Sequence, residues 1–141
     1  GPGRFYDCFD FDLFCGRLKV SVGSSYFRLV SRPRFALYGT KGTFVKVTED
    51  RQEEHLKMFA RPGTPGFGVD SPEHYGTLTY VDDDGVFHEE KVVSQVGDYA
   101  RFYDGVYATL VDGAPKVVKD EETIELIGIL EEGLKAWVPA D

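Results

Sequence analysis

The chain has 141 residues, a usual length for one domain, and carries a net charge of −8. Hydrophobic residues make up 42% of it and aromatic residues 14%, which excludes a disordered composition. Nucleic acid is excluded as the main partner, because phosphate binding requires clustered Lys and Arg. No apolar run approaches the roughly 20 residues of a membrane span, and no signal peptide is visible. We therefore expect a cytoplasmic protein whose two cysteines, Cys8 and Cys15, are reduced.

The first residues are unlike a natural N-terminus. The chain opens Gly1-Pro2-Gly3 without a Met, and strand-like sequence begins at once with Phe5. We interpret residues 1–3 as a tag scar or proteolytic end, and residues 4–141 as one domain of a longer protein.

Alternating side chains predict two hairpins in the first third of the chain. Residues 5–14 alternate as a half-exposed strand does, and residues 18–23 alternate again after a turn at Gly16. Residues 34–38 and 43–48 predict the next two strands, joined by a tight turn.

The middle of the chain predicts a short helix and a third hairpin. Asp50 is suited to cap a helix over residues 51–60, with Leu56 and Phe59 pointing inward. Residues 61–73, rich in Pro and Gly, predict a loop. Strands near residues 75–81 and 86–94 follow, joined by the hairpin turn Asp82-Asp83-Asp84-Gly85.

Two longer helices are predicted after Gly97. Asp98 is a good N-cap for the first, which Gly113 and Pro115 end. Asp120 is expected to cap the second, over residues 121–137. The helical spacing predicts two inner stripes, Tyr99, Phe102, Tyr103, Val106 and Leu110 in the first, and Ile124, Ile127, Leu130, Leu134 and Trp137 in the second.

This order of elements predicts an α+β fold: an open, largely antiparallel sheet of about six strands with helices on one face. Two helices and a short third can cover only one face of such a sheet. The other face is expected to pack on another subunit or domain. The large aromatic residues that favour this are Tyr6, Phe14, Tyr26, Phe27 and Tyr38.

No motif in the chain predicts a nucleotide site, a metal site or a nucleophile. The string GTKG at residues 39–42 has too short a spacing for a phosphate loop and leads into a strand. No G-x-G-x-x-G is present, and no G-x-S-x-G surrounds a serine. His55, His74 and His88 are far apart in sequence, and the run Asp82–Asp84 lacks the spacing of a calcium loop.

Three tyrosines recur every four residues on the helix after Gly97, at Tyr99, Tyr103 and Tyr107. One interpretation is core packing with the hydroxyls at the rim. The other is a row of hydroxyls that bind a polyhydroxylated ligand. The sequence leaves both open.

Four stretches, in this order, resemble the C-terminal domain of the Gfo/Idh/MocA oxidoreductases. This family comprises the glucose–fructose oxidoreductases, inositol dehydrogenases and rhizopine-catabolism proteins. The turn between Gly39 and Gly42, followed by Phe44 and Lys46, is the most family-like piece. The stretches are PRFALYGTKGTFVK (33–46), DRQEEHLK (50–57), PGFGVDSPEHYGTL (65–78) and the segment 96–137.

The resemblance implies a fold like the C-terminal domain of glyceraldehyde-3-phosphate dehydrogenase. It also implies an N-terminal Rossmann domain that binds NAD or NADP in the parent protein. The family's cofactor fingerprint, its Glu-Lys-Pro segment with the catalytic Lys, and its Asp-x-x-x-His segment lie before the matched region. This chain therefore inherits no catalytic, cofactor-binding or metal-binding residue, and alone it is expected to be inactive.

We expect the parent to be an NAD(P)-dependent dehydrogenase acting on a sugar or polyol, with this domain shaping the substrate cleft and the interface of a homo-oligomer. Tyr99 and Tyr103 are the expected substrate-side phenols, and Asp70, in the Gly66–Asp70 loop, lies at the expected cleft edge. The alternative is a stand-alone, non-catalytic binding or dimerisation module.

Overall fold

The computed structural model describes residues 8–136, which form two compact units. One unit is Arg32–Val117; the other combines the segments before and after it. The proposed scar at residues 1–3, the strand start at Phe5, the aromatic Tyr6 and the helical Trp137 lie outside the described residues.

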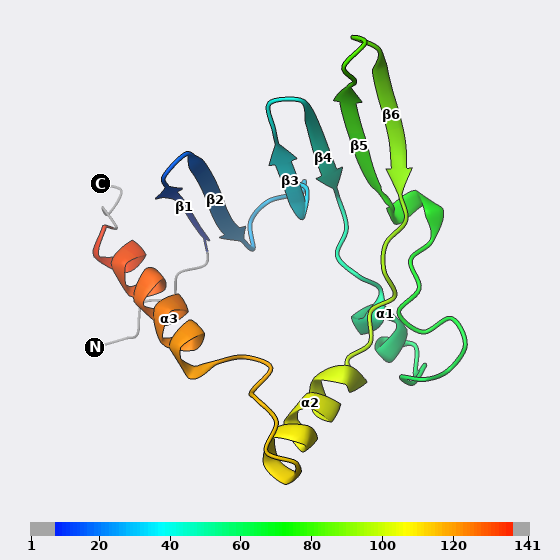
Figure 1. The fold of residues 1–141 in the computed structure, drawn as a ribbon, viewed down its shortest axis with the longest axis vertical. Helices are drawn as coiled ribbons and strands as arrows, with labels where there is room; N and C mark the ends of the chain where they lie inside the picture. Colours follow the sequence, from blue (N-terminus) through cyan, green and yellow to red (C-terminus); the bar gives the residue numbers. More distant parts are fainter. Residues whose placement is uncertain (1–7, 137–141) are drawn as a thin grey trace. The chain divides into compact units, whose positions relative to one another are not determined.

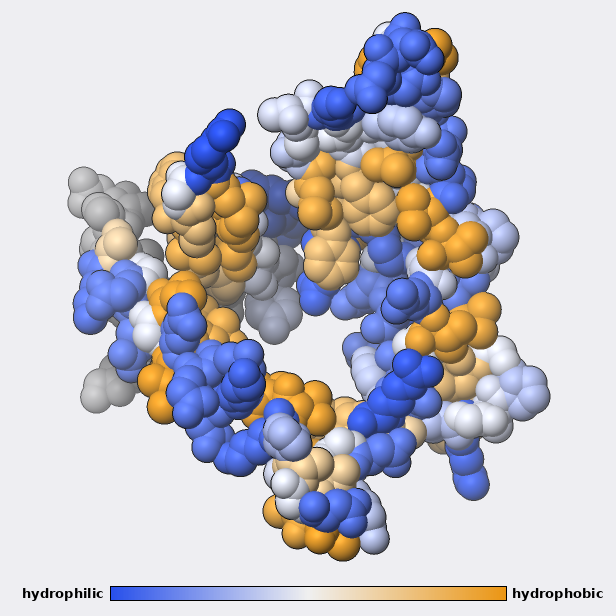
Figure 2. Space-filling model, viewed as in Figure 1, coloured by the Kyte–Doolittle hydropathy of each residue, from blue (hydrophilic) through white to orange (hydrophobic). Residues whose placement is uncertain are grey.

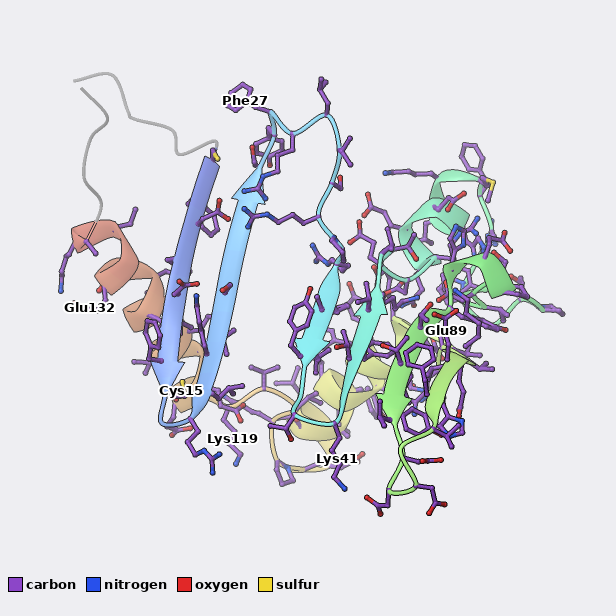
Figure 3. The ribbon with its side chains drawn as sticks, turned by 90° about the horizontal axis from the view of Figure 1, so that it is seen from above. Cys15, Phe27, Lys41, Glu89, Lys119 and Glu132 are labelled. Atoms are coloured by element: carbon purple, nitrogen blue, oxygen red, sulfur yellow. The ribbon has the colours of Figure 1, made fainter. Side chains whose placement is uncertain are left out.

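The unit built from the two ends of the chain contains one hairpin and one helix. Strand β1 (Cys8–Cys15) pairs antiparallel with β2 (Leu18–Ser25), and Gly16 takes a positive φ of 62° at the turn between them. Both cysteines are free thiols and exposed, and Cys15 lies at the turn end of β1 (Figure 3). Helix α3 (Asp120–Lys135) completes the unit.

The central unit holds a four-stranded antiparallel sheet in the order β3-β4-β5-β6 (Figure 1). The expected six strands are thus present in two sheets, of two and four strands. Neighbouring strands are also consecutive in sequence, so the sheet is a simple meander. Its strands are β3 (Phe35–Tyr38), β4 (Gly42–Lys46), β5 (Gly76–Val81) and β6 (Phe87–Val92).

The strand register divides the sheet residues between two faces. Residues paired across neighbouring strands share a face, and successive residues of one strand alternate. One face carries Phe35, Leu37, Phe44, Lys46, Leu78 and Val92. The opposite face carries Tyr38, Thr43, Thr79, Val81, Phe87 and Glu89.

Two salt-linked turns close one end of the sheet. Lys41 lies at the tip of the β3–β4 turn (Figure 3), and its Nζ is 2.7 Å from Asp83 Oδ1 in the β5–β6 turn. Asp82, in the second turn, has its Oδ2 2.7 Å from Nε2 of His88 on β6. The expected hairpin turn at residues 82–85 is confirmed, with Gly85 at a φ of 80°.

Strands β4 and β6 run in the same direction and lead to helices α1 (Gln52–Lys57) and α2 (Ala100–Val111) (Figure 1). The expected N-caps, Asp50 and Asp98, each lie one residue before the observed N-cap, which is Arg51 in α1 and Tyr99 in α2. Asp50 Oδ1 accepts a hydrogen bond from the Gln52 amide, and Asp98 Oδ1 accepts one from the Ala100 amide, each at 2.9 Å. These carboxylates satisfy amides that have no partner within the helix.

The expected cap of α3 is wrong, because Asp120 is the first residue of the helix. The carboxylate of Glu122 reaches back instead and accepts a hydrogen bond from the Lys119 amide at 2.9 Å. The expected loop at residues 61–73 also contains one short 3₁₀ turn, Pro72–His74.

Little apolar surface is buried between the described elements. Phe67 is the one buried hydrophobic side chain among residues 8–136. The expected inward orientation of Leu56 and Phe59 is wrong: Phe59 is 93% exposed and has a φ of 62°, which turns the chain away at the end of α1. The predicted stripes of α2 and α3 also retain 37% or more exposure in every large apolar residue described.

Hydrophobic residues therefore gather on the surface of both units (Figure 2). Phe27, in the loop that follows β2, is 74% exposed (Figure 3). The other aromatic residues from which we expected an open face are also exposed, namely Phe14, Tyr26 and Tyr38. Patches of this extent typically mark surfaces that other domains or subunits cover.

Candidate functional site

The central unit contains a pocket of about 490 Å³ on the face of the sheet that carries Phe44 and Lys46. Aromatic and charged side chains line it, some from the strands and some from the segments that leave the sheet. The residues that line it are Arg34, Phe35, Phe44, Lys46, Glu49, Asp50, Asp70, Gly76, Val92, Val93, Ser94, Gln95 and Tyr99.

Lys46, the last residue of β4, joins three segments of the unit. Its Nζ donates hydrogen bonds to Asp70 Oδ2 at 2.6 Å, to the His74 carbonyl at 2.7 Å and to Ser94 Oγ at 3.1 Å. A lysine ammonium group has three donors, so all of its donors are engaged. Lys46 therefore holds the pocket wall in place and has no donor left for a ligand.

Asp70 is the acidic partner in this cluster, and its side chain is 3% exposed. Burial alone would raise the pKa of its carboxyl group. The hydrogen bonds from Lys46 and Ser94, with the charge of Lys46, outweigh burial and hold the pKa below the usual value. Its Oδ1 has no hydrogen-bond partner within the described chain and is inaccessible to solvent.

Tyr99 is positioned by a buried amide side chain. Gln52, on α1, is 4% exposed, and its Oε1 accepts a hydrogen bond from the Tyr99 amide at 2.6 Å. The Gly97 amide donates to the Gly68 carbonyl at 3.3 Å, which ties the same segment to the Gly66–Asp70 loop. These contacts fix the start of α2 beside the pocket.

The structure brings together two of the three residues that we expected to contact substrate. Asp70 and Tyr99 both line the pocket, with Tyr99 43% exposed. Tyr103 is 69% exposed on α2 and does not line the pocket. Tyr107 is exposed as well, so core packing of this row of tyrosines within the described chain is wrong.

The Gly66–Asp70 loop is built around one buried ring. Phe67 is 6% exposed and lies 5.9 Å from the His55 ring, centroid to centroid. Gly66 and Gly68, on either side, have φ angles of 84° and 71°, which residues with a side chain rarely adopt. Asp70, the last residue of this loop, lines the pocket.

Sequence reasoning missed Lys46, Ser94 and Gln52 as site residues. One signal was available for Lys46, because it follows Phe44 by two positions and so shares the apolar face of β4. A charged residue on an apolar face requires a buried partner. No comparable signal existed for Ser94 or Gln52, whose partners lie more than 40 positions away in sequence.

The polar groups still available to a ligand lie at the rim. Arg34 and Glu49 form an exposed pair with 3.7 Å between Nη2 and Oε2, and Tyr99 is partly exposed. Together with the aromatic rings of Phe35 and Phe44, which line the same pocket, these groups offer both donors and acceptors. Such a combination suits a ligand with hydroxyl groups on an apolar ring or chain.

Among residues 8–136, no group of three or more His, Cys, Asp and Glu side chains is arranged to hold a metal ion. Within the same part of the chain, no helix has the length and apolar character needed to cross a membrane.

The fold and sequence are similar to those of known oxidoreductases. A Bacillus cereus oxidoreductase structure superposes with a TM-score of 0.82 at 43% identity, over 94% of this chain and 39% of that one. The sequence is 40% identical to "Uncharacterized oxidoreductase YhhX" of Escherichia coli strain K12, over 95% of this chain and 38% of YhhX. It is also 28% identical to the Bacillus subtilis scyllo-inositol 2-dehydrogenase (NADP(+)) IolW, over 92% of this chain and 36% of IolW.

The chain thus spans less than half the length of these relatives. The sequence profile of the oxidoreductase family C-terminal alpha/beta domain, Gfo/Idh/MocA, matches residues 14–137, nearly the whole chain. The chain therefore belongs to the Gfo/Idh/MocA oxidoreductase family, as its C-terminal α/β domain.

Proposed function

We propose that this chain is the substrate-side and oligomerisation domain of a cytoplasmic NAD(P)-dependent oxidoreductase that acts on a sugar or polyol. In the whole enzyme, hydride would pass between C4 of the nicotinamide and a carbinol carbon of the substrate. The nicotinamide and the lysine that assists proton transfer would be held outside this chain.

The observation that carries this proposal is the composition of the pocket. Its lining combines partly exposed donors and acceptors with two aromatic rings, within a domain of an oxidoreductase family. The name of the relative IolW, a scyllo-inositol dehydrogenase, agrees with a hydroxylated ring as the substrate class.

The three expected substrate residues have different roles in this proposal. Tyr99 would hydrogen-bond a substrate hydroxyl directly, since it lines the pocket and is partly exposed. Asp70 would act through the wall that it forms with Lys46. Tyr103, one turn further along α2, would contact a substrate only beyond the pocket rim.

The proposal is tested on the whole protein with NAD⁺ and NADP⁺ against a panel of inositols and sugars, following the absorbance of the reduced nicotinamide. We expect reduction with at least one polyol. Tyr99→Phe should raise KM by roughly three- to tenfold, as expected for the loss of one neutral hydrogen bond. The matched variant Tyr107→Phe, on the same helix, should leave KM unchanged.

Two outcomes would contradict the proposal. One is an absence of nicotinamide reduction with every polyol and sugar of the panel. The other is an equal change in KM for the Tyr99 and Tyr107 substitutions, which would mean that Tyr99 does not contact the substrate. For this chain alone we expect no turnover in the same absorbance assay. We also expect no nicotinamide binding, which equilibrium dialysis with NADPH would measure.

A further inference from the structure

We propose that the pocket wall supplied by this chain selects neutral polyols over phosphorylated ones, and that Glu49 determines this specificity. The inference rests on the proposed function, because it takes the pocket as the substrate site. Among the described residues that line the pocket, two are cations and three are carboxylates. Each feature of this wall that could attract an anion is already occupied within the chain, as the next three paragraphs argue.

Lys46 is the first of the two cations, and its charge is matched where it lies. Its three donors are engaged by Asp70 Oδ2, the His74 carbonyl and Ser94 Oγ. Its side chain is 14% exposed, and the Asp70 carboxylate is 2.6 Å away. An anionic ligand would have to displace one of these partners and would then lie beside Asp70. Lys46 therefore offers a phosphate group no attachment.

The start of α2, which brings Tyr99 into the pocket lining, is occupied as well. Free amides at the start of a helix bind anions readily. Here the Tyr99 amide donates to Gln52 Oε1 at 2.6 Å, and the Ala100 amide donates to Asp98 Oδ1 at 2.9 Å. The Arg101 amide donates to the Asp98 carbonyl at 3.2 Å. The Asp98 carboxylate thus takes the place at this helix end that an anion would otherwise favour.

Arg34 is the second cation, and Glu49 lies against it. The Arg34 amide donates to the Val47 carbonyl at 3.2 Å, one position beyond the last β3–β4 pair, so the hairpin brings the two side chains together. Arg34 Nη2 lies 3.7 Å from Glu49 Oε2, and both side chains are exposed. A ligand can rearrange an exposed pair of this kind. An anionic ligand, however, would compete with Glu49 for Arg34 and would be repelled by Glu49 itself.

Neutral hydroxyl groups meet none of these obstacles. An ionised carboxylate only accepts hydrogen bonds, whereas a hydroxyl group both donates and accepts. The exposed carboxylates of Glu49 and Asp50 can therefore accept from the hydroxyl groups of a polyol, and the Tyr99 hydroxyl can bind another. A phosphate group brings negative charge to the same carboxylate oxygens. Charge is thus the property by which this wall distinguishes the two classes of ligand.

The test measures binding and does not require turnover. The whole protein is titrated at low ionic strength, where exposed charges are least screened, by ligand-observed saturation-transfer NMR. The matched ligands are myo-inositol with myo-inositol 1-phosphate, and glucitol with glucitol 6-phosphate. NADH or NADPH is present, because a polyol cannot transfer hydride to a reduced nicotinamide. We expect the Kd of each phosphate ester to exceed that of its neutral parent by about fivefold or more, as for like charges at close range.

Glu49→Gln removes the repulsion and releases Arg34. It should reduce the ratio of the two Kd values by roughly two- to fivefold, the effect of one exposed ion pair. Glu89→Gln is the matched control, because it changes the net charge equally but lies on the sheet face opposite the pocket. It should leave the ratio unchanged. Addition of Arg34→Gln to Glu49→Gln should restore the original ratio, since the released cation is then absent.

Three outcomes would overturn this inference. They are equal or tighter binding of the phosphate esters, the same change of the ratio in Glu49→Gln and Glu89→Gln, and an absence of binding by both neutral ligands. The proposed function is judged separately. Selective binding of the neutral ligands without any nicotinamide reduction would contradict the oxidoreductase role and leave the specificity intact. Nicotinamide reduction by polyols together with equal binding of the phosphate esters would do the reverse.

Discussion

Lys46 Nζ lies 2.6 Å from Asp70 Oδ2, with side chains that are 14% and 3% exposed, although the two residues are 24 positions apart in sequence. The pair joins the end of β4 to a loop rich in Gly and Pro. In a unit with one buried hydrophobic side chain among its described residues, such a polar cluster is a main determinant of where the loop lies. The pocket wall therefore depends on a charge pair more than on apolar packing.

Removing both members of this pair should cost less stability than the sum of the costs of removing each one alone. Lys46→Met leaves the Asp70 carboxylate buried without its counter-charge, at a cost of about 3–5 kcal/mol in the free energy of unfolding. Asp70→Asn leaves the Lys46 ammonium unpaired and should cost nearly as much. Urea denaturation of all three variants measures their free energies of unfolding. The loss in the double variant should be smaller than the sum of the losses in the two single variants.

Lys41→Met is the control for this cycle. Lys41 and Asp83 are equally close, at 2.7 Å, but their side chains are 78% and 92% exposed. Exposed pairs contribute at most about 1 kcal/mol, so this substitution should have little effect. Strict additivity of the Lys46 and Asp70 substitutions would show that the pair does not act as a unit.

Asp70 should also contribute to stability in a pH-dependent way. Its folded-state pKa is lowered, so the unfolded chain binds more protons than the folded chain at acidic pH. Its contribution is complete above the ordinary aspartate pKa and is lost as pH falls through the lower folded value. Urea midpoints measured at and below about pH 4 should fall less steeply in Asp70→Asn than in the unsubstituted chain. Equal slopes would contradict the lowered pKa.

The secondary structure was largely predictable from sequence because it depends on local patterns. Period-two alternation indicates the strands, and Asp50 and Asp98 each lie two residues before the first residue of a helix. The cap of α3 was misassigned because both an Asp and a Glu were available, and the Glu122 side chain reaches the Lys119 amide. Local pattern alone does not decide between two such acceptors.

The burial of side chains was less predictable. The spacing of Leu56 and Phe59 indicated an inner face, but α1 ends before Phe59, which points into solvent. The contacts of Lys46 with Asp70 and Ser94 depend on strand register and loop path, which sequence periodicity does not specify. The four-residue spacing of the tyrosines indicates Tyr99, and the Gly66–Asp70 loop at the expected cleft edge indicates Asp70. The pocket that both residues line is apparent only in three dimensions.

Gly68 should tolerate alanine less well than Gly63, although both have positive φ angles, of 71° and 82°. A Cβ on Gly68 would overlap the Gly97 carbonyl, whereas one on Gly63 would meet open space. Both substitutions incur the left-handed backbone cost of roughly 1 kcal/mol. Gly68→Ala should lose more stability than Gly63→Ala in urea denaturation, and equal losses would mean that the Gly97 segment moves aside freely.

The side-chain amide of Gln52 should contribute to stability by holding the start of α2. Its Oε1 is the acceptor for the Tyr99 amide, and the residue is 4% exposed. Gln52→Leu keeps the approximate volume but leaves that amide unsatisfied, at a cost of about 1–3 kcal/mol. Exchange of the Tyr99 amide should accelerate in this variant. Glu53→Leu, on the exposed side of the same helix, should leave it unchanged.

The exposed apolar surface should make this chain self-associate. The face of the sheet opposite the pocket carries Tyr38 and Phe87, which are 80% and 66% exposed. Light scattering behind size exclusion should give at least twice the monomer mass of 15.8 kDa. Tyr38→Glu and Phe87→Glu should shift the chain toward monomer, because each would bury a charge in the interface. Met58→Glu, exposed but outside the sheet, is the matched control. A strict monomer at high concentration would mean that other parts of the whole protein cover this face, and the oligomerisation role would then be lost.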